Sequence, residues 1–342
     1  MNTDIKNMPK DLFELTPVDN NMNEKIERPS LTFWQDAWAR LKRNKGAMFG
    51  LIVMSIIILL AIIGPSMNSY TYKQQIQPIK NYTKLHPRVQ GLEKIGIANG
   101  IEKSGKNKYI EKGIEKDYFW FGTDELGRDL WTRVWSGTRV SLYIGLLAAL
   151  VDLLIGVTYG AVSGFYGGKV DIYMMRVIEI IGGIPSLVVV TLFILILQPG
   201  LLSMSLAIGL TGWMGMSRVV RSQILKLKNQ EFVLASRTLG ASNFQLIWKH
   251  LIPNILGQVI IMTTFTIPGA IFYEAFLAFI GLGLPAPNAS LGVLINDGYK
   301  FIKAGHAYMM VIPSVIICLL MLGLNLFANG LRDALDPKMR NL

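Results

Sequence analysis

The stretch EFVLASRTLGASNFQLIWKHLIPN, from Glu231 to Asn254, lies between two long apolar runs. It carries charged and amide side chains over a length that would accommodate two short helices. A few residues are enough to join two membrane-spanning segments, so a connection this long and this polar needs another purpose.

The first half of the stretch predicts a helix that stops at a glycine. Asn229 is a favourable N-cap, and Glu231 places a carboxylate near the positive end of the helix dipole. Gly240 follows Leu239 at the position where a left-handed residue ends a helix.

The second half predicts another helix. Ser242 followed by Gln245 is a capping box, and Pro253 predicts the end of the helix. Such a rigid, basic, cytoplasmic element is suited to being held by a partner. The alternative is an amphipathic connector on the bilayer surface, whose apolar residues would be Leu234, Leu239, Phe244, Leu246, Ile247 and Trp248.

The rest of the sequence is that of an all-α polytopic membrane protein. Of the 342 residues 51% are hydrophobic and only 17% are charged, too few for an ordinary soluble domain. The net charge of +11 comes from basic residues that flank the apolar runs. This distribution favours the positive-inside rule over nucleic-acid binding.

Six runs approach the ~20 apolar residues that cross a bilayer. Arg40, Lys42, Arg43 and Lys45 precede the first run, so we expect the N-terminus, and after six spans the C-terminus, in the cytoplasm. The six runs are Ala47–Met67, Val140–Phe165, Val177–Leu197, a fourth from the turn at 198–200 to Met216, Ile255–Ile280, and Tyr308–Asn329.

These runs divide the chain into parts. We expect residues 1–30 to be a flexible cytoplasmic tail, and residues 31–67 to form an amphipathic segment and the first span. Residues 68–120 are an outside insertion, and residues 121–342 are the transmembrane core. The insertion repeats a Gly-x-Glu-Lys pattern from Gly91, Gly100 and Gly113, which we interpret as a small β subdomain that is dispensable for folding.

The opening stretch resembles the "EAA" cytoplasmic loop of ABC importer permeases. The resemblance implies that the loop, within residues 221–254, docks onto an ATP-hydrolysing subunit and couples it to the spans. Leu234 stands in place of the motif's glutamate and Ser236 in place of its second alanine. The residues assigned to coupling are Glu231, Leu234, Ala235, Ser236, Arg237, Gly240, Ala241, Ser242 and Pro253.

A second stretch, FGTDELGRDLWTRVWSGTRVSL from Phe121 to Leu142, narrows the resemblance to OppC-like permeases of oligopeptide and dipeptide ABC importers. The matching residues are Gly122, Thr123, Asp124, Gly127, Arg128, Asp129, Arg133, Gly137, Arg139, Ser141 and Leu142. The family implies a type I importer permease fold and a bacterial cytoplasmic membrane location. The implied partners are an OppB-like permease, two ATPases like OppD and OppF, and an OppA-like lipid-anchored peptide-binding protein.

The charges of this second stretch have two interpretations of their own. Asp124, Arg128, Asp129, Arg133 and Arg139 place opposite charges at near-helical spacing on the outer surface. Local ion pairing that stiffens the entry to the second span is one interpretation. Contact with a partner permease or a substrate-delivering protein is the other, and the two are compatible.

Three carboxylates lie within or near apolar runs, where each needs a partner, a water-filled cavity or a proton. Glu274 is central to the fifth span with small neighbours, and we expect it to face the translocation path. Asp152 and Glu179 are further candidates, and Asp152 has Arg176 as a possible partner near the inner face. The alternative for all three is hydrogen bonding between helices.

The chain lacks the residues of an enzyme. The segment from Ser163 to Val170 misses a phosphate loop, and no nucleophile–base arrangement occurs on one plausible face. We expect ATP and magnesium to bind the partner ATPases and no cofactor to bind this chain. No metal site is expected either, because His86, His250 and His306 match no metal-ligand spacing.

The leading hypothesis is a permease subunit that forms half of a peptide translocation path. A permease of the same architecture for nickel or another small solute is an alternative. A self-sufficient secondary transporter is an alternative of a different class, but we find no internal repeat with matching broken helices.

Overall fold

The computed structural model describes residues 32–335 apart from 97 and 103–104, so the tail predicted for residues 1–30 lies outside it. The helices are α1 Phe33–Arg43, α2 Lys45–Ile63, α3 Ile79–Tyr82, α4 Lys108–Glu111, α5 Leu130–Val151, α6 Val157–Tyr166, α7 Gly168–Gly182, α8 Ser186–Leu197, α9 Leu201–Leu227, α10 Glu231–Thr238, α11 Asn243–Gln245, α12 Ile252–Leu277, α13 Leu291–Tyr299 and α14 Tyr308–Leu335. Short 3-10 turns cover Gly64–Ser66 and Leu92–Ile95, and wider π-helical turns cover Asp152–Gly156, Leu246–Leu251 and Ala278–Leu282.

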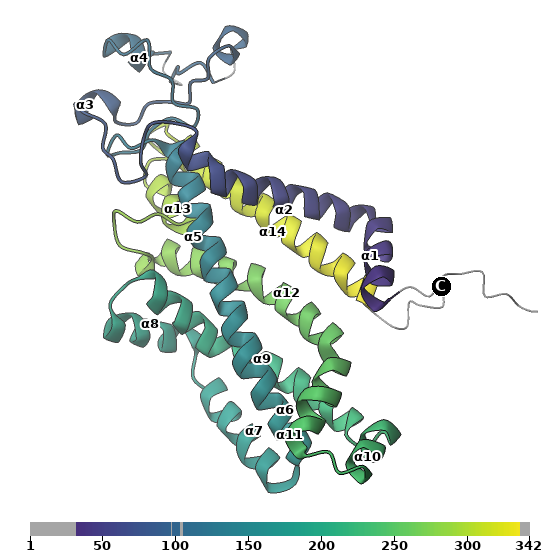
Figure 1. Cartoon of the computed structure of the whole chain (residues 1–342). Helices are drawn as coiled ribbons and strands as arrows, with labels where there is room; N and C mark the ends of the chain where they lie inside the picture. Colours follow the sequence, from purple (N-terminus) through teal and green to yellow (C-terminus); the bar gives the residue numbers. More distant parts are fainter. Residues whose placement is uncertain (1–31, 97, 103–104, 336–342) are drawn as a thin grey trace, which may run out of the picture.

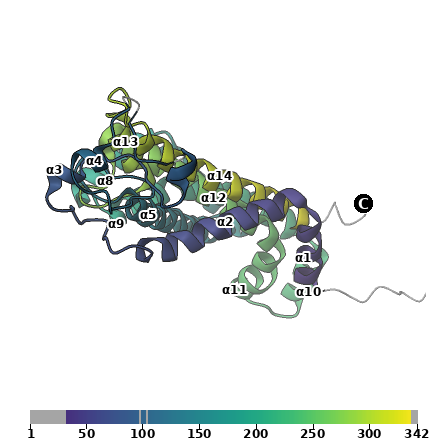
Figure 2. The ribbon, with the colours of Figure 1, turned by 90° about the horizontal axis from the view of Figure 1, so that it is seen from above.

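The long helices form an elongated bundle with a different small element at each end. Figure 1 shows α3 and α4 of the insertion at one end, and α10 and α11 at the other. Figure 2 shows α2 and α14 running side by side along the bundle. The amphipathic α1 turns away from α2 at Asn44, whose side chain caps α2 by accepting from the backbone N–H of Ala47 at 3.1 Å.

Small residues let the long helices approach closely. A Cβ on Gly50 of α2 would lie 2.6 Å from the carbonyl oxygen of Gly323 in α14. A Cβ on Gly160 of α6 would lie 2.3 Å from the carbonyl oxygen of Ser217 in α9, and Gly156 and Gly164 also face α9. Because lipid gives no hydrophobic drive between apolar helices, such close packing is a main source of their association.

The number of spans agrees only in part with the prediction of six. Among the described residues, four helical stretches are long and apolar enough to cross a membrane, and a bent pair makes up to five. The four are Lys45–Ser66, Leu130–Tyr166, Asn243–Leu282 and Tyr308–Leu335. The remaining predicted span lies in α9, which has 27 residues but is not one of those stretches. Six spans therefore stay a prediction.

The third predicted span, Val177–Leu197, is not one straight helix. It falls on α7 and α8, which meet at a bend of 79°. Gly182 and Gly183 end α7, and Pro185 is the N-cap of α8. Proline disfavours the helical conformation in the residue before it, so Ile184 breaks the helix.

The predicted β subdomain is wrong. Within the described part of the insertion no strand forms, and only isolated bridges such as Arg88 with Asn99 occur. The repeated glycines do form turns, with φ of +89° at Gly91, +76° at Gly100 and +67° at Gly113. The insertion is held together instead by a buried cluster of Ile76, Leu85, Tyr109 and Phe119.

Candidate functional site

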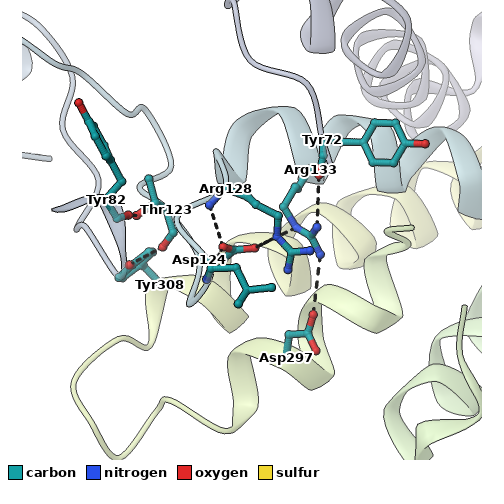
Figure 3. Close-up of polar contacts among 9 residues, drawn as sticks. Tyr72, Tyr82, Thr123, Asp124, Arg128, Arg133, Asp297 and Tyr308 are labelled. Carbon is teal, nitrogen blue, oxygen red and sulfur yellow. Dashed lines mark hydrogen bonds and ion pairs between the residues drawn. The ribbon is translucent and has the colours of Figure 1, made fainter. Parts of the chain in front are cut away.

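A buried ion-pair network lies where the insertion meets the start of α5 (Figure 3). Oδ2 of Asp124 lies 2.6 Å from Nε of Arg128 and 3.3 Å from Nε of Arg133. Oδ1 of Asp124 accepts from the backbone N–H groups of Leu126 and Arg128, both at 2.9 Å. The left-handed Gly127, with φ of +70°, lets the chain turn around this carboxylate.

Arg133 connects this turn to two other segments. Its side chain is only 1% exposed, and its Nη2 lies 3.8 Å from Oδ2 of Asp297 in α13. Its Nη1 donates to the carbonyl oxygen of Tyr72 at 3.4 Å. Burial raises the pKa of Asp297, and the charge of Arg133 opposes this rise. A pair whose members lie so far apart in the sequence fixes the tertiary arrangement.

The remaining charges of the stretch secure helix ends. Asp129 caps α5 by accepting from the backbone N–H of Thr132 at 2.8 Å, and it also accepts from Asn68 at 2.7 Å. Arg139 donates to the carbonyl oxygens of Ala61 and Ile62, both at 2.5 Å, in the last turn of α2. This geometry favours local pairing that stiffens the entry to α5, one of the two interpretations of these charges.

A hollow of about 420 Å³ lies among α8, α9, α12 and the junction of α5 with α6. Asp152 is the one carboxylate among the residues that line it. Its Oδ2 accepts from Oγ1 of Thr266 in α12 at 2.6 Å. The full lining is Ala148, Asp152, Ser186, Ile208, Thr211, Gly212, Thr266, Gly269, Ala270 and Tyr273.

The carboxylates predicted for the translocation path lie in three different surroundings. Glu274 is fully buried and accepts from Oγ of Ser141 in α5 at 2.9 Å, which favours the helix–helix alternative over a position facing a cavity. The structure does not pair Asp152 with Arg176, which instead contacts Glu179 at 2.7 Å on an exposed part of α7.

The opening stretch folds as two helical segments around a glycine, as predicted. Gly240 has φ of +87°. Its N–H donates to the carbonyl of Arg237 at 3.0 Å, and the N–H of Ala241 donates to that of Ser236 at 3.1 Å. This is the hydrogen-bond pattern of a Schellman motif. The capping box of Ser242 and Gln245 is present as well.

Two details of the stretch differ from the prediction. The N-cap of α10 is Gln230 and not Asn229. Pro253 does not end the second helix, because the π-helical turn Leu246–Leu251 runs on into α12 and Asn243–Leu282 is one helical stretch. Proline has no N–H to donate, and a local π-helical turn is one way in which a helix adjusts around it and continues.

The two sides of this element differ in exposure. Val233, Leu246, Ile247 and Leu251 are buried in a cluster with α6, α9 and α12, which fixes the element to the bundle. Apolar side chains on the other side are exposed, among them Leu239 at 88% and Phe244 at 69%, with Leu234, Phe232 and Trp248. An ordered element with exposed apolar side chains is typical of a surface that binds a protein partner or a membrane, so it fits both interpretations of the stretch.

Comparison with protein-family models identifies the chain. Residues 156–341, more than half of it, match the model of the binding-protein-dependent transport system inner membrane component. Residues 32–87 match the N-terminal transmembrane domain of oligopeptide transport permease C. The chain belongs to this family of transport permeases.

Relatives of this permease match over nearly its whole length. It is 43% identical to the dipeptide transport system permease protein DppC of Bacillus subtilis, over 97% of this chain and 94% of that one. It is 42% identical to the oligopeptide transport system permease protein OppC of the same species, over 98% and 100%. The Escherichia coli OppC protein is 34% identical over 94% and 96%.

A solved structure supports the fold. A chain of the inward-facing MetNI methionine ABC transporter superposes with a TM-score of 0.50 at 19% identity, covering 60% of the permease and 96% of that chain. The core thus has the fold of ABC importer permeases.

Sequence reasoning missed several residues that shape this permease. Arg221 of α9 forms a bidentate pair with Asp171 of α7, at 2.5 Å for both bonds. No local spacing predicts it, because the two residues lie on different helices. The Gly156, Gly160 and Gly164 series does have a sequence signal, a glycine at every fourth position in an apolar run.

Proposed function

We propose that the permease is a subunit of an ATP-driven peptide importer. The observation that carries this proposal is its 42–43% identity, over nearly the full length, to permeases of a dipeptide and an oligopeptide transport system. No histidine lines the hollow beside Asp152, so its lining gives no support to nickel as the cargo.

The two ends of the bundle take different partners in this proposal. The α10–α11 element lies in the cytoplasm with both termini and docks its exposed Leu239 and Phe244 onto OppD- and OppF-like ATPases, which hold ATP and magnesium. The insertion lies outside and faces an OppA-like binding protein. An OppB-like permease closes the other half of the path, whose lining on this chain includes the hollow at Asp152.

ATP-driven movement of the ATPases is transmitted through the buried side of the element. Val233 and Leu251 pack in one cluster with α6, α9 and α12, so a displacement of α10 moves helices that line the hollow. The Schellman turn at Gly240 keeps the element rigid enough to transmit that displacement.

Reconstitution tests the proposal. The chain is assembled with the second permease and both ATPases in liposomes, and uptake of a labelled tripeptide is measured with loaded binding protein. We expect uptake to require both ATP and the binding protein and to persist when an ionophore collapses the proton gradient. Uptake by the chain alone under an ion gradient, or uptake of nickel in place of peptide, would overturn it.

A further inference from the structure

Two histidines from distant parts of the sequence meet where the insertion rests on the core. His86 belongs to the insertion, and His306 is separated from the start of α14 at Tyr308 by Ala307 alone. Their ring centroids lie 5.1 Å apart. The ring of Tyr308 packs against both, with its centroid 4.9 Å from that of His86 and 6.1 Å from that of His306.

A carboxylate completes the group. Glu102, from a different part of the insertion, brings an oxygen to the two rings, and one ligand atom from each of the three residues lies within 4.8 Å of the others. This is the one such group of three His, Cys, Asp or Glu side chains in the part of the chain that the structure describes.

The two rings leave nitrogen atoms without hydrogen bonds. Nδ1 of His86 and Nδ1 of His306 are both buried from solvent and have no hydrogen-bond partner. Nε2 of His86 lies 3.4 Å from the carbonyl oxygen of Gly305, which selects the tautomer with the proton on Nε2 and the lone pair on Nδ1. Buried nitrogens are costly to leave unpaired, and a ring nitrogen that carries a lone pair can bind a metal ion.

We infer that His86, Glu102 and His306 form a binding site for a divalent transition metal, with Zn²⁺ as the ion that suits it best. Two imidazoles and one carboxylate, with water in the fourth position, are a common zinc ligand set. Since two ligands come from the insertion and the third from the residue pair preceding α14, the ion ties the insertion to the core. This inference goes beyond the proposed function, because it concerns an ion that the permease itself binds and not the cargo.

A lysine competes for the same carboxylate. The ammonium of Lys108 forms an ion pair with Oε1 of Glu102, so the metal must share or displace that contact. Removing the carboxylate removes a ligand, whereas removing the lysine removes a repelling charge. The two substitutions break the same ion pair but have opposite effects on metal affinity.

The test is Zn²⁺ binding to the full-length chain in detergent, purified with a tag that lacks histidine and stripped with a chelator. Bound zinc is counted by elemental mass spectrometry, and affinity is measured by competition with a chromophoric chelator. We expect one Zn²⁺ per chain, and at least about ten-fold weaker binding in His86→Gln, His306→Gln and Glu102→Gln. His250→Gln is the matched control and should bind normally.

Glu102→Gln and Lys108→Gln separate the metal site from a folding effect. We expect Glu102→Gln to bind more weakly and Lys108→Gln to bind several-fold more tightly, whereas a loss of structure would weaken both. The inference is overturned if the unsubstituted chain takes up no more zinc than the His86→Gln, His306→Gln double variant. It is also overturned if the Glu102 and Lys108 variants change affinity in the same direction.

Discussion

Arg133 is a buried cation that faces two carboxylates, and its substitution gives a sharp prediction. Arg133→Met leaves Asp297 without its nearest buried cation. It also removes one of the two arginines that pair with Asp124. Breaking a buried pair by removing one partner costs about 3–5 kcal/mol. We expect a marked fall in the thermal stability of the purified chain. Thermal stability is measured as the temperature at which the chain ceases to be monodisperse.

The exposed pair of Arg176 and Glu179 is the control for that experiment. Its side chains are 68% and 56% exposed, and solvent screens such a pair to within about 1 kcal/mol. Arg176→Gln should therefore leave thermal stability almost unchanged. Equal losses of thermal stability in the two variants would mean that the buried ion pairs of Arg133 stabilise the chain no more than the exposed pair of Arg176 and Glu179.

Thiol labelling distinguishes an exposed position at the hollow from the buried position of Glu274. In a Cys318→Ala background, Ser186→Cys lies at the hollow on an exposed position, whereas Glu274→Cys lies in a fully buried one. A water-soluble maleimide should modify the cysteine at 186 at least about ten-fold faster, because exposure controls access to a thiolate. Rapid modification at 274 would restore Glu274 to the translocation path.

For individual residues, the sequence predicts ion pairs between side chains that are close in the chain. It misses pairs between side chains that are far apart in the chain. Asp124 with Arg128 follows from i,i+4 spacing, and the structure has that pair. Asp297 was not anticipated as a partner of Arg133, because α13 lies far along the chain from α5. For the same reason the sequence suggests Arg176 as the partner of Asp152, whereas the hydrogen-bond partner of Asp152 is Thr266.

Among the elements, the α10–α11 segment is the one whose hinge can be tested by a single substitution. A Cβ on Gly240 would meet nothing within 4 Å, so the cost of Gly240→Val comes from its φ of +87° alone. That conformation costs an L-residue about 1–2 kcal/mol, and more when it is β-branched. We expect normal insertion but at least a several-fold loss of ATP-driven uptake per ATP hydrolysed in the reconstituted complex.

Gly215 of α9 provides the matched control. It is exposed, its added Cβ would also meet nothing within 4 Å, and its φ is not positive. Gly215→Val should retain coupling because valine can adopt a helical conformation there at a small cost. Normal coupling in Gly240→Val would show that the left-handed turn is not needed to transmit movement.

Element boundaries were predictable where side chains cap the backbone locally. Ser242 with Gln245, and Gly240, are sufficient to specify the second helix start and the first helix end. Pro253 does not mark a helix end, because the π-helical turn before it lets the helix adjust and continue, and no local pattern in the sequence predicts that turn. The bend between α7 and α8 has a local cause at Pro185, but hydropathy alone averages over it.

For the whole molecule, the family fold was predictable and the packing of the insertion was not. Periodicity and hydropathy identify apolar helices, and the spacing of the Phe121–Leu142 stretch identifies the permease family. Neither reveals that Leu85, Tyr109 and Phe119 form a buried cluster, because the apolar residues of the insertion are scattered among lysines. The expectation that the insertion is dispensable rested on that polar composition.

The contacts of the insertion argue against that expectation. The backbone N–H of Thr123 donates to the carbonyl of Leu85, and that of Lys84 donates to the carbonyl of Asp124, both at 3.0 Å. The hydroxyl of Tyr308 in turn donates to the carbonyl of Thr123 at 2.9 Å, which links the same turn to α14 (Figure 3). The insertion therefore supports the turn that holds Asp124.

We accordingly predict that replacing residues 73–116 with a short Gly-Ser bridge prevents assembly. The replacement removes Leu85 and Tyr109, leaves Phe119 exposed, and deprives the Asp124 turn of its backbone partners. Burial of each large apolar side chain contributes about 1.5–3 kcal/mol to stability, and this contribution is lost when the burial is lost.

Replacing only residues 90–97 with a two-residue turn is the matched control, because the hydrogen bond from Val89 to Ala98 closes that loop. Thermal stability and co-purification with the partner permease should fall in the first variant and survive in the second, since only the first removes the cluster. If the large replacement assembles normally, the cluster stabilises the insertion alone and the turn at Asp124 needs no support from it.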